Sequence, residues 1–185
     1  MANWTARRIA REAGILAGTV LLLASARSSL AEPYHVPTGS MEPSIEVGDH
    51  IVVDKLAYGV RVPFTNTYAV SFAGPHVGDV VVLDSPEEDK VLVKRVVAGP
   101  GQTVEVRDGH VVLDGVEEPL APASLAAGTG PDYGPETLPD DRYFVLGDNR
   151  GDSHDSRFFG AVSRSAILGH AMGVYWRSGP AWDGL

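Results

Sequence analysis

Short runs of valine, isoleucine and leucine, separated by glycine, proline and aspartate, make up most of the chain from residue 32 onward. No long stretch repeats its apolar residues with the 3.6-residue period of an amphipathic helix. Apolar runs of this length between turn residues are typical of antiparallel β-structure. The pattern therefore predicts a mainly β protein, with strands at residues 50–54, 79–84, 90–98, 103–107, 110–113, 143–147 and 167–176.

Two connections between these strands have distinct compositions. Asp108 and Gly109 form an Asp-Gly pair between two predicted strands, and such pairs favour the positive φ angles of a tight hairpin turn. Residues 121–139 are rich in Ala, Gly, Pro and acidic residues and show no apolar pattern. They are predicted to form a long surface loop, which is either a flexible lip or a simple connection.

The first 31 residues follow a different pattern. Residues 13–26 carry no charge and come after Arg7, Arg8 and Arg11. A basic cluster followed by an apolar segment is typical of an export signal, and the arginines favour the cytoplasmic side of the membrane. The chain from about Glu32 onward is therefore expected outside the cytoplasm.

Three interpretations of this apolar segment stay open. Its fourteen uncharged residues are short for a membrane span and suit a cleavable signal, with residues 29–31 (Ser-Leu-Ala) as the cleavage site. Extended to Ala31, the segment has nineteen residues and one charge, Arg27. A helix of that length, roughly 28 Å, can span a membrane if the arginine reaches the interface. The third interpretation, a buried helix of a soluble domain, gives the arginine cluster no role.

Length, charge and cysteine content narrow the function classes. A chain of 185 residues can bury one core, or one core plus a small lobe, so a single catalytic unit is expected. The net charge is -9, and residues 1–31 contribute +3 (four arginines against Glu12), which leaves -12 on the rest. A body this acidic is repelled by a phosphate backbone, which excludes nucleic acid as a partner. The absence of cysteine excludes a thiol nucleophile, a disulfide framework and a thiolate metal site.

The first segment with candidate chemistry is residues 37–43 (Pro-Thr-Gly-Ser-Met-Glu-Pro). One interpretation is a simple turn. The other is that the prolines and Gly39 hold the Ser40 hydroxyl rigidly, as a nucleophile requires. A serine needs a neighbouring base to take its proton, and the six histidines of the chain stand in unrelated contexts.

Lysine is the other possible base. In the predicted strand at 90–98, Lys94 shares a face with Leu92 and Val96, while Arg95 points the opposite way. Apolar neighbours lower the pKa of a lysine, and a neutral lysine can act as a general base. The alternative is that Lys94 lies on the solvent face of the sheet or extends past its neighbours to water.

The third candidate segment is residues 147–160, which hold three Asp, one Asn and one His within eight positions. The spacing does not match the calcium-loop pattern, and two arginines lie inside the segment. An internal network of salt bridges and hydrogen bonds is therefore predicted in preference to a metal site. No metal and no cofactor are expected.

Together these segments resemble bacterial type I signal peptidases. Residues 38–43 resemble the nucleophile box of that family, and residues 48–53 (Gly-Asp-His-Ile-Val-Val) resemble the box after it. Residues 94–101 resemble the base box, and residues 147–157 resemble the last box. The order and spacing match from about residue 7 to the C-terminus. Four ordered boxes behind an export segment are far more specific than any single box.

The resemblance implies a set of roles for the site. Ser40 would be the nucleophile, Lys94 its base, and Ser153 the residue that orients the lysine. The Ser40 backbone N–H and the Thr38 hydroxyl would form the oxyanion hole. A lysine base, where a histidine would stand in the endoplasmic-reticulum branch of the family, argues against that branch. The residues implied as a supporting network are Asp148, Asn149, Arg150, Asp155 and Arg157.

The resemblance also implies a fold and a mode of substrate binding. The fold is a partly open, barrel-like antiparallel β domain over residues 32–185, with an N-terminal transmembrane helix within residues 1–31. The second lobe of larger relatives would be reduced to a hairpin and loop around residues 103–142. Substrates would bind extended along strand edges, with small side chains in shallow apolar pockets. The candidate pocket walls are Val36, Met41, Ile45 and Leu92.

The expected partners are the signal peptides of exported preproteins and, through the N-terminal segment, membrane lipid. The chain is expected to be a monomer in the cytoplasmic membrane, with its N-terminus in the cytoplasm and its catalytic domain on the outer face. One alternative is a dedicated maturation protease of a conjugation or pilus system. An autoproteolytic repressor also uses Ser and Lys, but such a cytoplasmic protein would not begin with an export segment. A non-enzymatic, membrane-tethered β-rich binding module would leave the placement of Lys94 unexplained.

Overall fold

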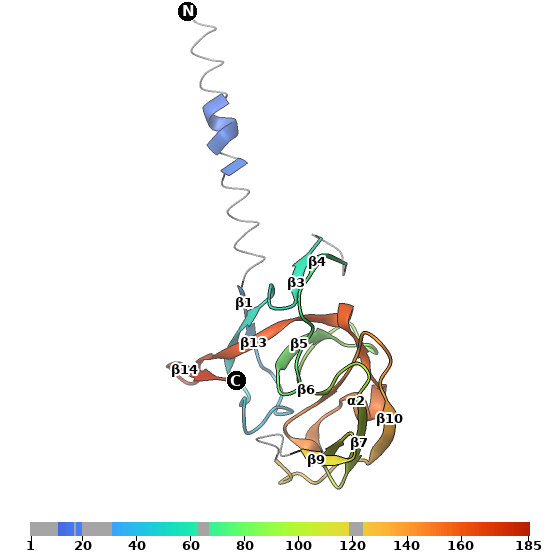
Figure 1. Ribbon diagram of the computed structural model, residues 1–185. Helices are drawn as coiled ribbons and strands as arrows, with labels where there is room; N and C mark the ends of the chain where they lie inside the picture. Colours follow the sequence, from blue (N-terminus) through green and yellow to red (C-terminus); the bar gives the residue numbers. More distant parts are fainter. Residues whose placement is uncertain (1–10, 17, 20–30, 63–66, 119–123) are drawn as a thin grey trace, which may run out of the picture.

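The computed structural model describes residues 11–16, 18–19, 31–62, 67–118 and 124–185 (Figure 1). Strands dominate these residues, which confirms the prediction of a mainly β protein. The strands are β1 (Ala31–His35), β2 (His50–Asp54), β3 (Gly59–Arg61), β4 (Tyr68–Ser71), β5 (Val80–Asp84), β6 (Val91–Ala98), β7 (Thr103–Arg107), β8 (His110–Leu113), β9 (Val116–Glu118), β10 (Tyr133–Thr137), β11 (Arg142–Leu146), β12 (Val162–Ser163), β13 (Ile167–Trp176) and β14 (Pro180–Gly184). The short helices are η1 (Arg150–Asp152), α2 (Ser156–Phe159) and η2 (Arg164–Ala166).

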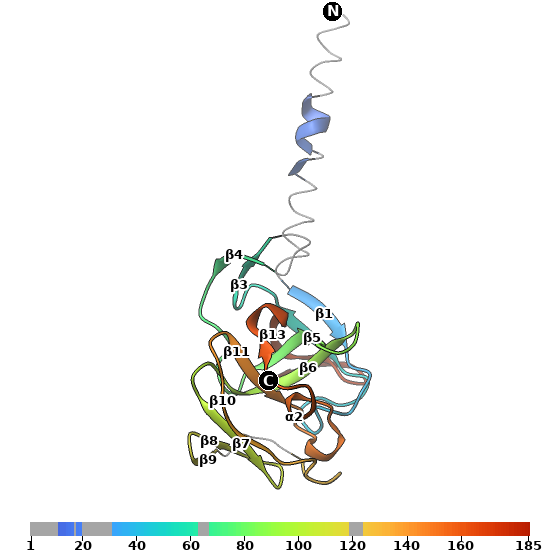
Figure 2. The same ribbon diagram turned by 90° about the vertical axis from the view of Figure 1, so that its right-hand side faces the viewer.

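The main sheet holds eight of these strands in the order β1-β2-β13-β5-β6-β11-β12, with β14 paired to β13. Neighbouring strands are antiparallel, and the sheet curls into a half-open barrel (Figure 2). Strand β5 is buried on both faces: Val80 and Val82 pack into one core cluster, and Val81 and Leu83 into another. The partly open, barrel-like sheet expected from the resemblance is therefore present.

A second, four-stranded sheet follows, in the order β10-β7-β8-β9. Its β7–β8 hairpin turns at Asp108 (φ 48°) and Gly109 (φ 77°), so the predicted Asp-Gly turn is confirmed. Val104 and Val106 of β7 share a core cluster with Phe144 of β11. This cluster joins the second sheet to the main one.

The prediction of an uninterrupted loop over residues 121–139 is wrong at its C-terminal part, where β10 pairs with β7. The segment around residues 103–142 is thus a small sheet and more than a hairpin and loop. Four of the five residues of β10 are exposed, and two of these are Gly134 and Pro135. An exposed edge strand does not alternate apolar and polar residues, so its sequence does not reveal it.

Each strand expected from the sequence is present, within one residue at either end. The strands that the sequence did not predict are short or lie at sheet edges: β1, β3, β4, β9, β10, β12 and β14. Such strands bury few side chains and so leave a weak apolar pattern.

The predicted anchor within residues 1–31 falls mostly outside the described residues. Residues 11–16 and 18–19 are helical. Across the described ranges, no helix combines the length and the apolar character needed to cross a membrane.

Candidate active site

Ser40 lies in the turn that joins β1 to β2. The turn is closed at its base, because the Val36 N–H donates to the Asp49 carbonyl (2.9 Å) and the Gly48 N–H donates to the Val36 carbonyl (2.8 Å). Just after Ser40, the Met41 side chain is completely buried in the first core cluster. The turn is therefore anchored from both ends and from below, which fixes the position of the serine.

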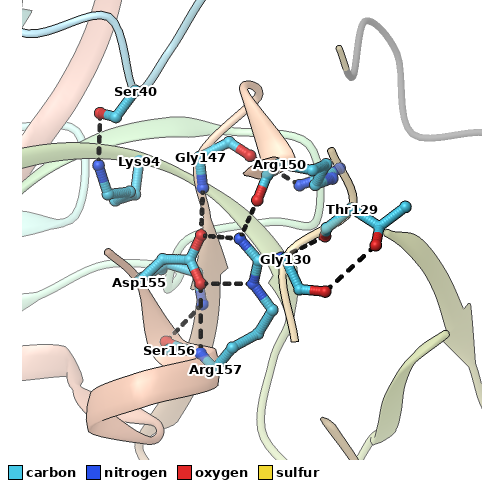
Figure 3. A network of polar contacts seen from close by, with 10 residues as sticks. Ser40, Lys94, Thr129, Gly130, Gly147, Arg150, Asp155, Ser156 and Arg157 are labelled. Atoms are coloured by element: carbon cyan, nitrogen blue, oxygen red, sulfur yellow. Dashed lines mark hydrogen bonds and ion pairs between the residues drawn. The ribbon is translucent and has the colours of Figure 1, made fainter. Parts of the chain in front are cut away.

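Lys94 of β6 brings its amine to this serine. The distance from Lys94 Nζ to Ser40 Oγ is 2.7 Å (Figure 3). The lysine is only 3% exposed, and its flanking residues Leu92 and Val96 both pack with the third core cluster. The alternative of a solvent-facing Lys94 is therefore wrong.

Burial lowers the pKa of Lys94 to about 8, because the charged amine loses its hydration. The nearby carboxylate of Asp155 acts in the opposite direction and limits this shift. A pKa near 8 leaves a useful fraction of the amine neutral and able to accept a proton.

Asp155 is the centre of a buried network beside the lysine (Figure 3). Its carboxylate accepts two hydrogen bonds from the Arg157 guanidinium, both at 2.9 Å, and one from the Gly147 N–H at 3.0 Å. Arg157 also donates to the carbonyls of Thr129 and Arg150, each at 2.7 Å. These bonds hold the segment after β11 in one conformation.

A second buried ion pair supports the site from the other side of β6. Arg95 binds both carboxylate oxygens of Asp148, with Nε–Oδ1 at 2.9 Å and Nη2–Oδ2 at 2.7 Å. The Ser44 hydroxyl donates to the same carboxylate. Neither Arg95 nor Ser44 is among the site residues predicted from the sequence. The available signal was that Arg95 must point away from Lys94 into the protein, where its charge needs a carboxylate.

The segment after β11 meets the turn that carries Ser40 at Asn149. Its backbone N–H donates to the Ser40 carbonyl (3.1 Å), and its side-chain Nδ2 donates to the Gly39 carbonyl (3.1 Å). Nearby, Arg150 is buried and donates to the Gly147 carbonyl (2.9 Å). The structure thus brings the residues of the predicted network together around Ser40 and Lys94.

Ser153 lies beside the pair but does not form the expected hydrogen bond to Lys94. Its hydroxyl oxygen is buried and has no hydrogen-bond partner among the described residues. It lies against Gly147, where a Cβ atom would come within 2.2 Å of Ser153 Oγ and 2.4 Å of the Ser40 carbonyl oxygen. The orienting role of Ser153 stays a prediction.

The two groups expected to form the oxyanion hole belong to residues 36–49, the turn between β1 and β2, which we call the nucleophile turn. Thr38 is exposed, and neither its hydroxyl nor the Ser40 N–H donates a hydrogen bond to another of the described residues. Both groups are therefore available to a bound substrate.

Three of the four candidate pocket residues are buried close to the turn that carries Ser40. Val36, Met41 and Ile45 are at most 3% exposed and pack together in the first core cluster. Leu92 is half-buried and keeps accessible surface near Lys94. The assignment of these four residues to the pocket walls stays a prediction.

A serine hydroxyl hydrogen-bonded to a buried lysine of lowered pKa, on a curled antiparallel sheet, is the arrangement of serine peptidases that use lysine in place of histidine. Comparison with known families places the chain among them. The model of the family "Signal peptidase, peptidase S26" matches residues 9–176, and the chain belongs to this family.

Two relatives that are similar in sequence agree with this assignment. The chain is 34% identical to a signal peptidase I of Leptolyngbya laminosa, over 85% of this chain and 75% of that protein. It is 35% identical to a signal peptidase I of Pseudomonas aeruginosa, over 83% of this chain and 67% of that protein. A crystal structure of a signal peptidase I from Enterococcus faecalis is similar with 31% identity and a TM-score of 0.46, and it covers 54% of this chain and 98% of its own.

Proposed function

We propose that the chain is a serine endopeptidase that removes N-terminal signal peptides from exported preproteins after small residues. The observation that carries the proposal is the 2.7 Å hydrogen bond between Ser40 Oγ and the buried Lys94 Nζ. Membership of the signal peptidase family supplies the substrate class. The chemistry follows from the two side chains.

In the first half of the reaction, neutral Lys94 takes the proton of Ser40 as Oγ attacks the carbonyl carbon of the scissile bond. The carbonyl oxygen becomes an oxyanion, which the Ser40 N–H and the Thr38 hydroxyl stabilise. Protonated Lys94 then gives its proton to the leaving amine. The mature protein departs, and the signal peptide stays attached to Ser40 as an ester.

The second half repeats these steps with water. Lys94, again neutral, takes a proton from a water molecule that attacks the ester carbon. The tetrahedral intermediate collapses, and Ser40 Oγ regains its proton from Lys94 as the signal peptide leaves with a carboxylate. The lysine therefore alternates between base and acid, which its pKa of about 8 permits.

Two strand edges near the pair support binding of an extended substrate. Within the described residues, β1 is the end strand of the main sheet. β11 pairs with β6 at Arg95, Val96 and Ala98, which leaves one edge of β6 open beside Lys94. An extended peptide can add its backbone hydrogen bonds to such edges. The half-buried Leu92 lies at this position and can limit the size of the side chain before the cut.

The test is cleavage of a preprotein that carries small residues at the first and third positions before the cut. Ser40→Ala and Lys94→Ala are each expected to abolish cleavage, since one lacks the nucleophile and the other the base. The products are identified by mass spectrometry of the new N-terminus. Ser85→Ala and Arg107→Ala are matched controls outside the residues of the site and should cleave like the unaltered protein. Full activity of Lys94→Ala would remove the mechanism.

The same proposal includes a location. Residues 1–31 act as a retained anchor with the arginines in the cytoplasm, so that residues 32–185 work as a monomer on the outer face of the membrane. The support is the basic-then-apolar sequence of that segment.

A further inference from the structure

Asn149 is the residue that connects the last box to the nucleophile turn. It is 8% exposed, and it holds two successive carbonyl groups of that turn. Its N–H donates to the Ser40 carbonyl and its Nδ2 to the Gly39 carbonyl, each at 3.1 Å. The contact between the two segments is therefore made to the backbone of the turn, on both sides of the Ser40 residue.

The Gly39 carbonyl determines where the Ser40 N–H points. In a trans peptide unit the carbonyl and the following N–H are coplanar and point in opposite directions. Two donors hold this carbonyl, the Asn149 side chain and the Glu42 N–H (3.1 Å). The Ser40 N–H consequently faces away from the last box, and a rotation of this peptide unit would break both bonds.

Asn149 is itself held by residues 124–130, which we call the strap. Ser124 forms a parallel bridge with Asn149. The Ser124 N–H donates to the Asp148 carbonyl (2.7 Å), and the Arg150 N–H donates to the Ser124 carbonyl (3.0 Å). The strap therefore fixes the backbone on both sides of Asn149.

The side-chain amide of Asn149 has one acceptable orientation. Its Oδ1 atom is buried without a donor among the described residues. A flipped amide would place this oxygen against the Gly39 carbonyl oxygen and lose the hydrogen bond. In this orientation the Asn149 side chain donates to the Gly39 carbonyl and holds the peptide unit between Gly39 and Ser40.

We propose that Asn149 is a positioning residue that aims the Ser40 N–H at the oxyanion of the reaction. The inference rests on the proposed function and extends it. Asn149 acts through the peptide unit before the nucleophile, whose carbonyl it binds. It supports the transition state, where the oxyanion exists, and contributes little to ground-state binding.

The experiment compares Asn149→Ala and Asn149→Asp with the unaltered protein. Alanine removes the side-chain donor, and aspartate replaces it with an acceptor of almost the same shape. Both variants keep the backbone N–H that binds the Ser40 carbonyl. Asp152→Asn, an exposed position in the same segment, is the matched control. The readouts are kcat, KM, the pH midpoint of kcat/KM and the melting temperature.

In both Asn149 variants, kcat is expected to fall by about 10- to 100-fold, somewhat less than the loss of a whole oxyanion donor. KM should stay within about threefold, because the effect is confined to the transition state. In Asn149→Ala the pH midpoint should not move, because no charge near Lys94 changes. In Asn149→Asp the added carboxylate acts on Lys94 in the same direction as Asp155 and should raise the midpoint. The proposal is overturned if kcat is unchanged, if the loss is confined to KM, or if the midpoint shifts in Asn149→Ala. It is also overturned if activity is lost only to the extent that the melting temperature falls.

A second readout uses a peptide aldehyde that ends in alanine. Ser40 Oγ adds to the aldehyde carbon, the serine proton passes to Lys94, and the former carbonyl oxygen takes the oxyanion position. The aldehyde should bind the Asn149 variants about 10- to 100-fold more weakly, in proportion to kcat/KM. The corresponding peptide alcohol, which cannot form this adduct, should bind all variants equally. Equal aldehyde binding would contradict the positioning role.

These outcomes are separate from failure of the proposed function. If the unaltered protein cleaves no preprotein, the signal-peptide assignment fails. The difference between aldehyde and alcohol binding then still tests the position of the Ser40 N–H. Formation of the aldehyde adduct needs only Ser40, Lys94 and the peptide unit between Gly39 and Ser40, and does not need a preprotein substrate.

Discussion

The amine of Lys94 has a pKa of about 8, compared with about 10.5 for an exposed lysine, because its surroundings are apolar. In the proposed reaction only the neutral amine is active. Below pH 8 the amine is mostly protonated and cleavage is slow. As the pH rises through this value the amine loses its proton and cleavage becomes faster.

We accordingly predict that kcat/KM rises with pH along a single ionisation with its midpoint near pH 8. The measurement is a pH profile of peptide cleavage at constant ionic strength. A midpoint near 6.5, the ordinary value for histidine, would instead indicate a histidine base and would contradict the role of Lys94.

Gly147 is a second residue with a direct consequence for activity. A Cβ atom at this position would lie 2.4 Å from the Ser40 carbonyl oxygen and 2.2 Å from Ser153 Oγ. These distances are far shorter than any van der Waals contact. An added methyl group must therefore displace the nucleophile turn.

We predict that Gly147→Ala lowers kcat by about 100-fold, the effect of a displacement of about 1 Å at the reacting atoms. Steady-state cleavage assays measure the loss. Gly184→Ala, where a Cβ atom meets nothing within 4 Å, is the control and should remain fully active. Normal activity of Gly147→Ala would show that the turn tolerates displacement.

At the level of elements, interior strands were predictable and edge strands were not. Strand β5 buries three valines and a leucine, and the long strand β13 buries Ile167, Ala171 and Val174, so both leave an apolar pattern in the sequence. Strand β1, with an alternating but half-exposed pattern, and strand β10, which is mostly exposed, have no such mark. Edge strands depend on their partners more than on their own side chains.

The site likewise has features that could be predicted from the sequence and features that could not. The apolar context of Lys94 was a local signal, so its burial could be predicted. The Ser44–Asp148 and Arg95–Asp148 contacts join residues 104 and 53 positions apart, and the strap reaches Asn149 through backbone groups. Contacts of this kind depend on the register of the folded sheet, which no single segment of sequence contains.

The segment after β11 depends on a fully buried ion pair. The side chains of Asp155 and Arg157 are both 0% exposed. Arg157 also reaches the strap through the Thr129 carbonyl. Loss of the guanidinium leaves a buried carboxylate without its main partner.

We predict that Arg157→Met lowers the free energy of unfolding by about 3–5 kcal/mol. Denaturant unfolding measures this change. Arg107→Met removes an exposed ion pair with Glu105 and should have little effect. A similarly small effect of Arg157→Met would show that the buried pair does not hold this segment.

For the whole molecule, the proposed location rests on the charge distribution and on the N-terminal segment. The first 31 residues are basic and apolar, and the remaining body is acidic. This asymmetry favours a chain whose start stays at the membrane and whose body lies in water outside it.

We predict that the full chain, with residues 1–31 retained, fractionates with membranes and resists extraction at high pH and high salt. A variant that starts at residue 32 should be recovered in the soluble fraction. N-terminal sequencing of the membrane-bound protein checks that the segment is present. A soluble mature protein that begins at Glu32 would favour the dedicated, released maturation protease.

The position of Pro33 in β1 has a consequence for unwanted association. Pro33 pairs with Val52 of β2, and because a proline has no N–H, its nitrogen must face away from β2 toward the outer edge of the strand. The ladder of donors along that edge is therefore interrupted. A short peptide can still pair near His35, at the end of β1 that leads to the nucleophile turn, but a long strand of another molecule cannot continue along the edge. The interruption keeps the edge open to peptides and closed to sheet-to-sheet aggregation.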